Sequence, residues 1–294
     1  MASVEREVRH CPIGLLMNEL LTPKNANRLA LGLARQRRIH YREAEAILQS
    51  LTLRLVIDQN SCRTVAFQAS LLTAFNASNR AFLGGVSVEM PDDVALLLPL
   101  PGIRSLNEAL RTTGYEPRET AAPSQTIYIG HTPVESTPNS CRVDCDGWRG
   151  VVSDFDNPAI FEYGTSDDFA LGGSFAGGLA AHRCFLKATE IPARSLEKPL
   201  GLSLWSPGSD WQKPVSASPL LHNLPNRFWL LGLGHLGQAF IWNLAMLPFP
   251  KRPEVEFLCF KYFPKVDQHV QEPRSHKKPG SVFDPFRPFG EPAG

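Results

Sequence analysis

The residues with the clearest chemical pattern in this chain are three glycines, Gly232, Gly234 and Gly237, spaced as Gly-x-Gly-x-x-Gly. An apolar run, 228–231, precedes them and a helix-like apolar pattern, 238–247, follows. In a Rossmann-type unit the first glycine permits a tight turn, the second lets backbone approach a phosphate, and the third lets the helix pack on the strand. Backbone N–H groups and the helix dipole then favour an anion. The pattern predicts a nucleotide-binding turn, with a tight turn that holds no ligand as the alternative.

A nucleotide bound at this turn would contact its whole length. The predicted cofactor-binding residues are Gly232, Leu233, Gly234, His235, Leu236 and Gly237. A dinucleotide site also needs an acidic residue about 20 residues further on, at the end of the second strand, to bind ribose hydroxyls. The expected second strand, 255–260, continues into Lys261-Tyr-Phe-Pro264, and Glu256 lies within it. The usual ribose anchor is therefore missing from its expected position.

The composition indicates a globular protein without a strong overall charge. Lysine and arginine number 30 against 29 aspartates and glutamates, which argues against nucleic acid or an anionic membrane as partner. Six scattered cysteines and the lack of a signal peptide favour a reducing, cytoplasmic location. No apolar run reaches the roughly 18 residues of a membrane span. Cys141-x-x-x-Cys145 has no second pair at metal-ligand spacing, so no metal site is predicted.

Helical and strand-like patterns alternate before the glycine turn. Helices are predicted at 25–38, 41–51, 64–82, 105–112 and 172–186, and strands at 53–57, 86–90, 126–129, 141–145 and 150–153. Gly84-Gly85 is expected to cap the helix 64–82. We expect 53–57, 86–90 and 126–129 to lie in one largely parallel sheet with that helix packed on it. The predicted fold class is α/β and Rossmann-like, with a degenerate first half and an incomplete second nucleotide-binding half.

Several conspicuous residues are assigned structural roles. The basic run Arg35-Gln-Arg-Arg38 is interpreted as a solvated helix face, with contact to ATP or nucleic acid as the alternative. Gly172-Gly173 is expected to allow close helix packing rather than to cradle an anion. His182 is expected to be exposed or satisfied, and no catalytic residue can be named.

The domain organisation follows from changes in composition. Residues 1–189 form a degenerate Rossmann-like α/β domain, and 190–226 a surface connector anchored by Trp205 and Trp211. Residues 227–260 begin a nucleotide-binding unit. Residues 261–294 are expected to be a disordered tail, because nine prolines between Pro248 and Pro292 prevent regular hydrogen-bond ladders.

Taken together, these motifs resemble the ThiF family, the ubiquitin-activating-like adenylyltransferases, and in particular a bacterial subgroup with a degenerate N-terminal half. The resemblance spans roughly 25–258 and rests on Phe67–Asn76, Arg80–Gly85, Gly147–Gly150, Ala176–Ala181 and Leu231–Gln238. It implies ATP-dependent adenylation, with magnesium, of the C-terminal glycine of a ubiquitin-like or sulfur-carrier protein. A homodimer is the candidate assembly.

Parts of the family's pattern are absent. The second strand of the family ends in an acidic pair, where this chain has Phe260-Lys-Tyr-Phe263. Phe240, Ile241, Leu244 and Leu247 need a partner that later strands would supply. We therefore expect a truncated chain, with a reading-frame shift near Leu258, that shows no adenylation turnover on its own. The alternatives are an NAD(P)-binding oxidoreductase and a non-catalytic docking protein with a nucleotide-binding fold.

Overall fold

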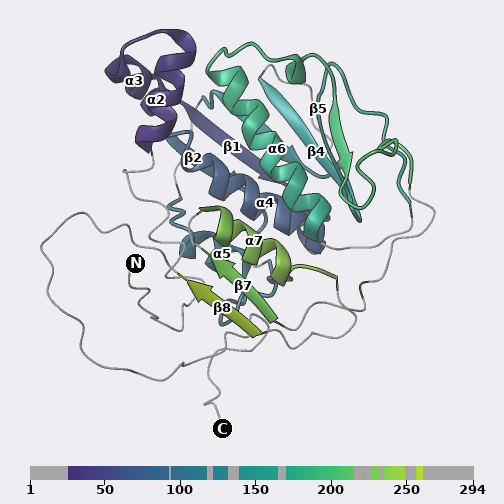
Figure 1. The fold of residues 1–294 in the computed structure, drawn as a ribbon. Coiled ribbons are helices and arrows are strands. Elements are labelled where there is room, and N and C mark those ends of the chain that lie inside the picture. The colour runs from purple at the N-terminus through teal and green to yellow at the C-terminus, as the bar shows by residue number, and fades with distance from the viewer. Residues whose placement is uncertain are drawn as a thin grey trace, which may run out of the picture.

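The computed structural model confirms the Rossmann-like α/β class predicted from the sequence (Figure 1). A six-stranded unit is followed along the chain by a smaller strand–helix–strand unit. The structure describes residues 26–92, 94–117, 122–131, 139–164, 170–214, 221, 227–231, 235–248 and 256–260. The predicted tail, 261–294, lies outside the described residues.

The main sheet has the strand order β2-β1-β3-β4-β5-β6. Its strands are β1 (Thr52–Ile57), β2 (Gly85–Glu89), β3 (Gln125–Ile129), β4 (Ser140–Asp146), β5 (Arg149–Asp154) and β6 (Leu200–Ser203). The first four run parallel, and β5 and β6 are antiparallel to their neighbours. The predicted parallel sheet is confirmed, and the predicted strands 141–145 and 150–153 are present and pair with each other. The edge strand β6 comes from the stretch 190–226 that was expected to be a connector.

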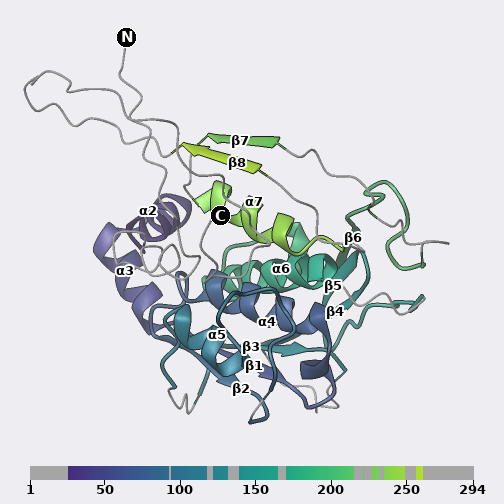
Figure 2. The same cartoon turned by 90° about the horizontal axis from the view of Figure 1, so that it is seen from below.

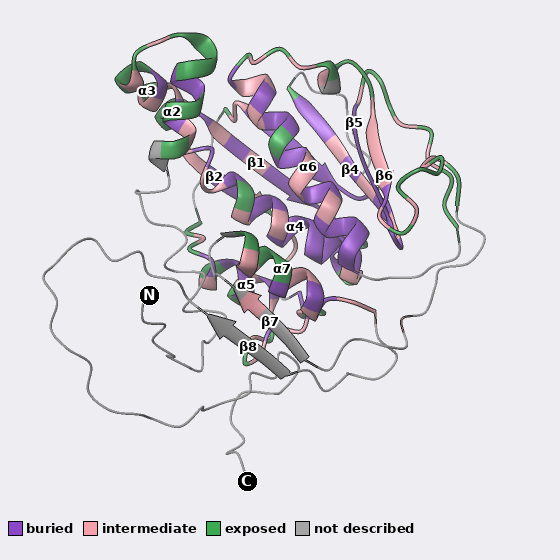
Figure 3. Cartoon of the chain, in the orientation of Figure 1, coloured by how far each residue is buried: buried purple, intermediate pink, exposed green. Residues whose placement is uncertain are grey.

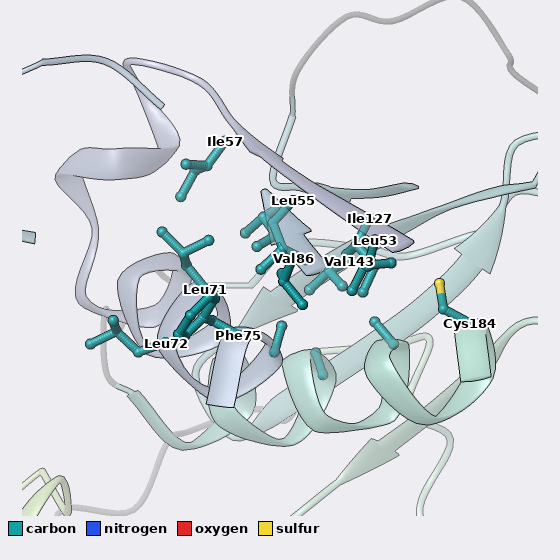
Figure 4. Packing of buried hydrophobic residues seen from close by; sticks show 14 of the residues in the cluster. Leu53, Leu55, Ile57, Leu71, Leu72, Phe75, Val86, Ile127, Val143 and Cys184 are labelled. Atoms are coloured by element: carbon teal, nitrogen blue, oxygen red, sulfur yellow. The ribbon is translucent and has the colours of Figure 1, made fainter. Parts of the chain in front are cut away.

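One face of this sheet carries the hydrophobic core because side chains alternate along each strand. Leu53, Leu55 and Ile57 of β1 point toward the helices and are almost fully buried (Figure 4). Ile127 and Val143 continue the same layer on β3 and β4. The parallel strands therefore provide the apolar surface against which the helices pack.

Two long helices, α4 (Val65–Ser78) and α6 (Ala170–Ala188), lie side by side on that face (Figures 1 and 2). They approach so closely that a Cβ on Gly173 would overlap the carbonyl oxygen of Ala66, and one on Gly177 would overlap that of Ser70. Shorter helical elements are η2 (Ser61–Arg63), α5 (Leu106–Thr112) and η3 (Arg194–Leu196). The expectation that the small residues of 172–186 serve close packing is confirmed.

The predicted end of the helix 64–82 was wrong. Helix α4 stops at Ser78, and Gly84-Gly85 lie beyond a turn rather than at the helix end. The chain leaves the helix because the N–H of Leu83 donates to Leu48 O and that of Gly84 to Leu51 O. A Cβ on Gly84 would lie 2.6 Å from Leu51 O, so this glycine serves close backbone approach.

The two helices predicted before β1 are present as α2 (Ala26–Arg37) and α3 (Tyr41–Ser50), and they pack together as a hairpin. Ala30 and Leu33 pack with Ala44 and Leu48 into the main core. The outer surface of the hairpin is mostly exposed (Figure 3).

The second unit consists of β7 (Arg227–Leu231), α7 (His235–Ala245) and β8 (Glu256–Phe260). Strands β7 and β8 pair in parallel as a separate two-stranded sheet. Figure 2 shows α7 lying between this small sheet and the α4–α6 layer. The unit is thus stacked on the helices of the first one.

Candidate nucleotide site

The predicted glycine turn connects β7 to α7. Strand β7 ends at Leu231 and helix α7 begins at His235, so the glycine motif follows a strand and precedes a helix, as in the order of a Rossmann unit. Gly232, Leu233 and Gly234 lie outside the described residues. His235, Leu236 and Gly237 form the first turn of α7.

The start of α7 is open to solvent. The side chain of Leu236 is 88% exposed, so described parts of the protein do not cover this face of the first turn. The first N–H groups of a helix have no partner within the helix and can donate to an anion. The geometry therefore suits a phosphate group that approaches from the side of the glycine turn.

The acidic residue of the second strand lies at the wrong end for a ribose contact. Glu256 is the first residue of β8 and is paired with Arg227, the first residue of β7. Ligands of parallel α/β sheets bind at the carboxyl ends of the strands. At that end β8 finishes with Phe260, and the residues that follow, Lys261 to Pro264, include no acid and lie outside the described part.

Helix α7 is anchored to the first unit through its C-terminal half. Ile241 and Leu244 are buried, and Met246 belongs to the main core cluster. Leu247 packs against a second cluster formed by Trp148 and Leu171.

Of the four apolar side chains predicted to need a partner on α7, three are therefore at least partly covered. Phe240 remains 47% exposed. The first unit supplies a partner that the sequence patterns had assigned to later strands.

In the first unit, the turn after β1 packs directly against the chain after β3. Strand order reverses between β1 and β3, and this switch point is where open α/β sheets bind ligands. Asp58, just after β1, accepts hydrogen bonds from the N–H groups of Asn60 and Ser61 at 2.7 and 2.8 Å. Gly130, just after β3, has a φ of 85° and faces Ser61 so closely that a Cβ would overlap the Ser61 hydroxyl. The turn after β1, which lacks a glycine motif, is therefore occupied by its own hydrogen bonds and by the contact between Ser61 and Gly130.

A polar cluster that the sequence patterns did not predict lies near the carboxyl ends of β3 and β4. The Tyr163 hydroxyl donates to the Asp144 carboxylate and lies 3.3 Å from His131 Nδ1. Burial raises the pKa of Asp144, although the hydrogen bond from Tyr163 opposes this rise. Burial and the neighbouring carboxylate raise the pKa of Tyr163 well above its usual range, so it stays protonated.

The cluster has a structural explanation. Tyr163 belongs to the segment 155–164, which crosses the sheet face opposite α4 and α6. Phe155 of this segment packs edge-on against Tyr128, with ring centroids 5.3 Å apart. The guanidinium of Arg149 stacks over the Phe161 ring, with its Cζ atom 4.6 Å from the ring centroid. These contacts hold the segment on the sheet and leave no activated nucleophile among them.

Two arginines are buried with complete sets of partners. Arg183 of α6 binds both oxygens of Asp154, at 3.1 and 2.7 Å, and donates to Leu196 O and Lys198 O. Arg149 pairs with Asp146 and donates to two backbone carbonyls. Both networks join elements rather than face a ligand.

The remaining predicted features fall into structural roles. Gly172 packs against the backbone of β5, and His182 is exposed on α6 as expected. The Trp211 ring packs against Gly201 of β6, and the ring centroids of Trp205 and Trp148 are 5.5 Å apart. Both tryptophans therefore anchor the chain after β6.

The described residues hold no group of three or more His, Cys, Asp or Glu side chains that could bind a metal ion. Within that part of the chain, every helix is too short or too polar to cross a bilayer.

Comparison with known families identifies both units. A model of the BilD N-terminal domain matches residues 52–204, which is more than half of the chain, and a model of the BilD C-terminal domain matches residues 224–270. The second match extends past residue 261, where the tail was expected to begin.

The chain is also similar to a curated protein, the bacterial E1-like protein BilD of Collimonas sp. (strain OK412). The two are 32% identical over 220 residues, which cover 74% of this chain and 47% of the relative. The chain thus spans about half the length of the curated relative that it matches.

Proposed function

Since the chain belongs to the BilD family, we propose that it takes part in the activation of a ubiquitin-like protein. The reaction we assign to the complete site is ThiF-type adenylation, in which a C-terminal glycine carboxylate attacks the α-phosphate of ATP and pyrophosphate leaves. The substrate class is a ubiquitin-like or sulfur-carrier protein. The observation that supports this proposal is the β7–turn–α7–β8 unit with the glycine motif at its turn.

The residues of this chain are suited to bind the phosphates of ATP but not its ribose or the magnesium ion. Backbone N–H groups of Gly232 to Gly237 would hold the phosphates, and they would stabilise negative charge as the carboxylate attacks. Binding of the ribose and of magnesium requires carboxylates, and none follows β8 where the family places them. We therefore propose weak ATP binding and no adenylation turnover by this chain alone.

The first unit acts as a platform in this proposal. Its own switch point is closed by Ser61, and its helices carry α7 through Met246 and Leu247. In this proposal the nucleotide binds at Gly232–Gly237, and the first unit supports the helix that follows.

A panel of nucleotides tests the proposal. The full chain is titrated with ATP, NAD and NADP by isothermal calorimetry, and pyrophosphate exchange is measured with ATP present. We expect that ATP binds and that NAD and NADP do not. Pyrophosphate exchange should stay at background. Preference for NAD or NADP would instead support an oxidoreductase, and absence of all binding would support a docking protein. Clear exchange by this chain would contradict the predicted lack of turnover.

A further inference from the structure

The α2–α3 hairpin carries a cluster of exposed arginines. Its joining region, 35–42, holds four arginines and no acidic residue. Arg35, Arg38 and Arg42 are all exposed, in a protein whose formal net charge is only +1. The hairpin also precedes residues 52–204, the part matched by the BilD N-terminal domain.

The outward face of α2 combines these charges with an apolar side chain. Arg28, Leu31, Gly32 and Arg35 follow helical spacing and are all exposed. Leu31 is 43% exposed, between two arginines. The opposite face, including Leu33, is buried against α3 and the core.

A glycine lies within this outward face at a cost to the helix. Glycine in a helix interior destabilises it by about 1 kcal/mol relative to alanine. Among the described residues, a Cβ on Gly32 would meet no atom within 4 Å, so packing within that part of the protein does not require a glycine here. A bare backbone patch on a surface helix permits close approach of another chain.

An arginine stands at the end of the same helix where glycine would be more favourable. Arg38 has a φ of 56°, and the N–H of Ile39 donates to Ala34 O, as in the helix-ending motif that favours glycine. The hairpin therefore has a glycine where alanine would suit the fold better and an arginine where glycine would. Local costs of this kind are expected at binding surfaces.

From this combination we propose that the outer face of α2 is a docking surface for an acidic, leucine-containing segment of a protein partner. Carboxylates of the partner bind Arg28, Arg35 and Arg38, its apolar side chain contacts Leu31, and its backbone approaches at Gly32. Arg37 of this hairpin already binds a carboxylate, that of Glu190 just after α6, at 2.9 Å.

A protein segment fits this surface better than nucleic acid. Glu43 and Glu45 follow the basic run on α3, so the positive charge covers only a short stretch, which suits a short acidic segment better than a continuous phosphate backbone. The near-neutral whole molecule adds no long-range attraction for a polyanion. Leu31 offers contact area that phosphates cannot use.

Fluorescence anisotropy tests the proposal with the full chain. The probe is a short fluorescein-labelled peptide of alternating glutamate and leucine, and its glutamine–leucine counterpart is the uncharged control. An oligothymidylate of equal charge is the nucleic-acid arm. We expect the acidic peptide to bind more tightly than both, and the affinity to fall as salt is raised. Failure of the acidic peptide to bind, or tighter binding of the oligonucleotide, would overturn the proposal.

Matched variants locate the surface. The first replaces Arg28, Arg35 and Arg38 by glutamate, and the control replaces the exposed Arg63, Arg104 and Arg111, which lie outside the hairpin, in the same way. The two variants have the same net charge. We expect the hairpin variant to lose about tenfold in affinity and the control variant to keep it. Equal losses would show a non-specific charge effect and contradict the proposal.

Gly32→Ala separates docking from folding. Because its side chain would enter open space, the variant should melt at a higher temperature than the native chain. We nevertheless expect it to bind the acidic peptide more weakly. A more stable variant with unchanged affinity would show that Gly32 does not contact the partner.

Discussion

At the scale of single residues, the buried charges of the first unit carry the largest energetic consequences. Asp154 holds Arg183 through two hydrogen bonds and also contacts Lys187 Nζ at 2.7 Å. Removing one partner of such a network leaves the other charge buried without compensation.

We predict that Asp154→Asn lowers the free energy of unfolding by about 3–5 kcal/mol, because the Arg183 side chain is only 2% exposed. Urea unfolding monitored by circular dichroism measures the change. Lys187→Met is the matched control, since Lys187 is more exposed and its loss leaves the bidentate pair intact. If both variants lost a similar unfolding free energy, the Asp154–Arg183 pair would contribute no more to stability than the contact with Lys187.

The same carboxylate predicts a dependence of stability on acid. Burial alone would raise the pKa of Asp154, but hydrogen bonds from Arg183 and Lys187 outweigh it, and the pKa is lowered. Its stabilising contribution is therefore complete above its ordinary pKa of about 4 and is lost as pH falls toward the lowered folded value. Between pH 6 and roughly 3, the native chain should lose more stability than Asp154→Asn. Parallel curves for the two proteins would refute this linkage.

Residue contacts of this kind could not be predicted from the sequence. Asp144 and Tyr163 meet because a segment between β5 and α6 folds back across the sheet, and no local pattern specifies that path. Ser61 and Gly130 likewise come together only through the order of β1 and β3. The glycine turn at 232–237 was recognisable because its residues are adjacent in the chain.

At the scale of elements, the packing of α6 against α4 depends on two glycines spaced four residues apart. Gly173 and Gly177 each face a carbonyl oxygen of α4, whereas Gly178 faces only the Thr73 methyl at 3.8 Å from an added Cβ. The three positions therefore provide an internal comparison on one helix.

We predict that Gly173→Ala destabilises the protein by about 3 kcal/mol or more, because the methyl group would force the helices apart. Gly178→Ala should be neutral or stabilising by up to about 1 kcal/mol, since alanine favours a helix. Thermal unfolding of both variants gives the comparison. Equal effects would mean that the two helices do not depend on this close approach.

The elements themselves were largely predictable, for a physical reason. Period-two and helical apolar patterns over 53–57 and 64–78 reflect which face each element buries, and that information is local. The end of α4 was misplaced because Gly84 is needed for close approach to the backbone of Leu51 and not for capping the helix. That contact joins residues distant in the sequence. The edge strand β6 was missed because its four residues, Leu200–Ser203, lie within a proline-rich stretch.

At the scale of the whole molecule, the two units share a core through α7. Met246 is 6% exposed within the main cluster, while Leu236 on the first turn is 88% exposed. The order of the units along the chain was predictable, but the packing of α7 on the first unit was not, because the partner surface is distant in sequence.

We predict that Met246→Ala lowers the free energy of unfolding by about 2–5 kcal/mol and speeds hydrogen exchange in α7. Leu236→Ala, as the exposed control, should change stability by less than about 0.5 kcal/mol. If α7 exchanges equally fast in the native chain and in Met246→Ala, the proposed docking on the first unit is incorrect.

The central proposal is that Gly232–Gly237 form a nucleotide-binding turn. Its most direct test is the ATP affinity of Gly234→Val, measured by calorimetry beside the native chain and the folded control Gly178→Ala. The valine side chain would block the approach of a phosphate to the backbone. We predict that the native chain and Gly178→Ala bind ATP weakly and equally, and that Gly234→Val does not bind it. Unchanged ATP affinity in a folded Gly234→Val chain would contradict the proposal.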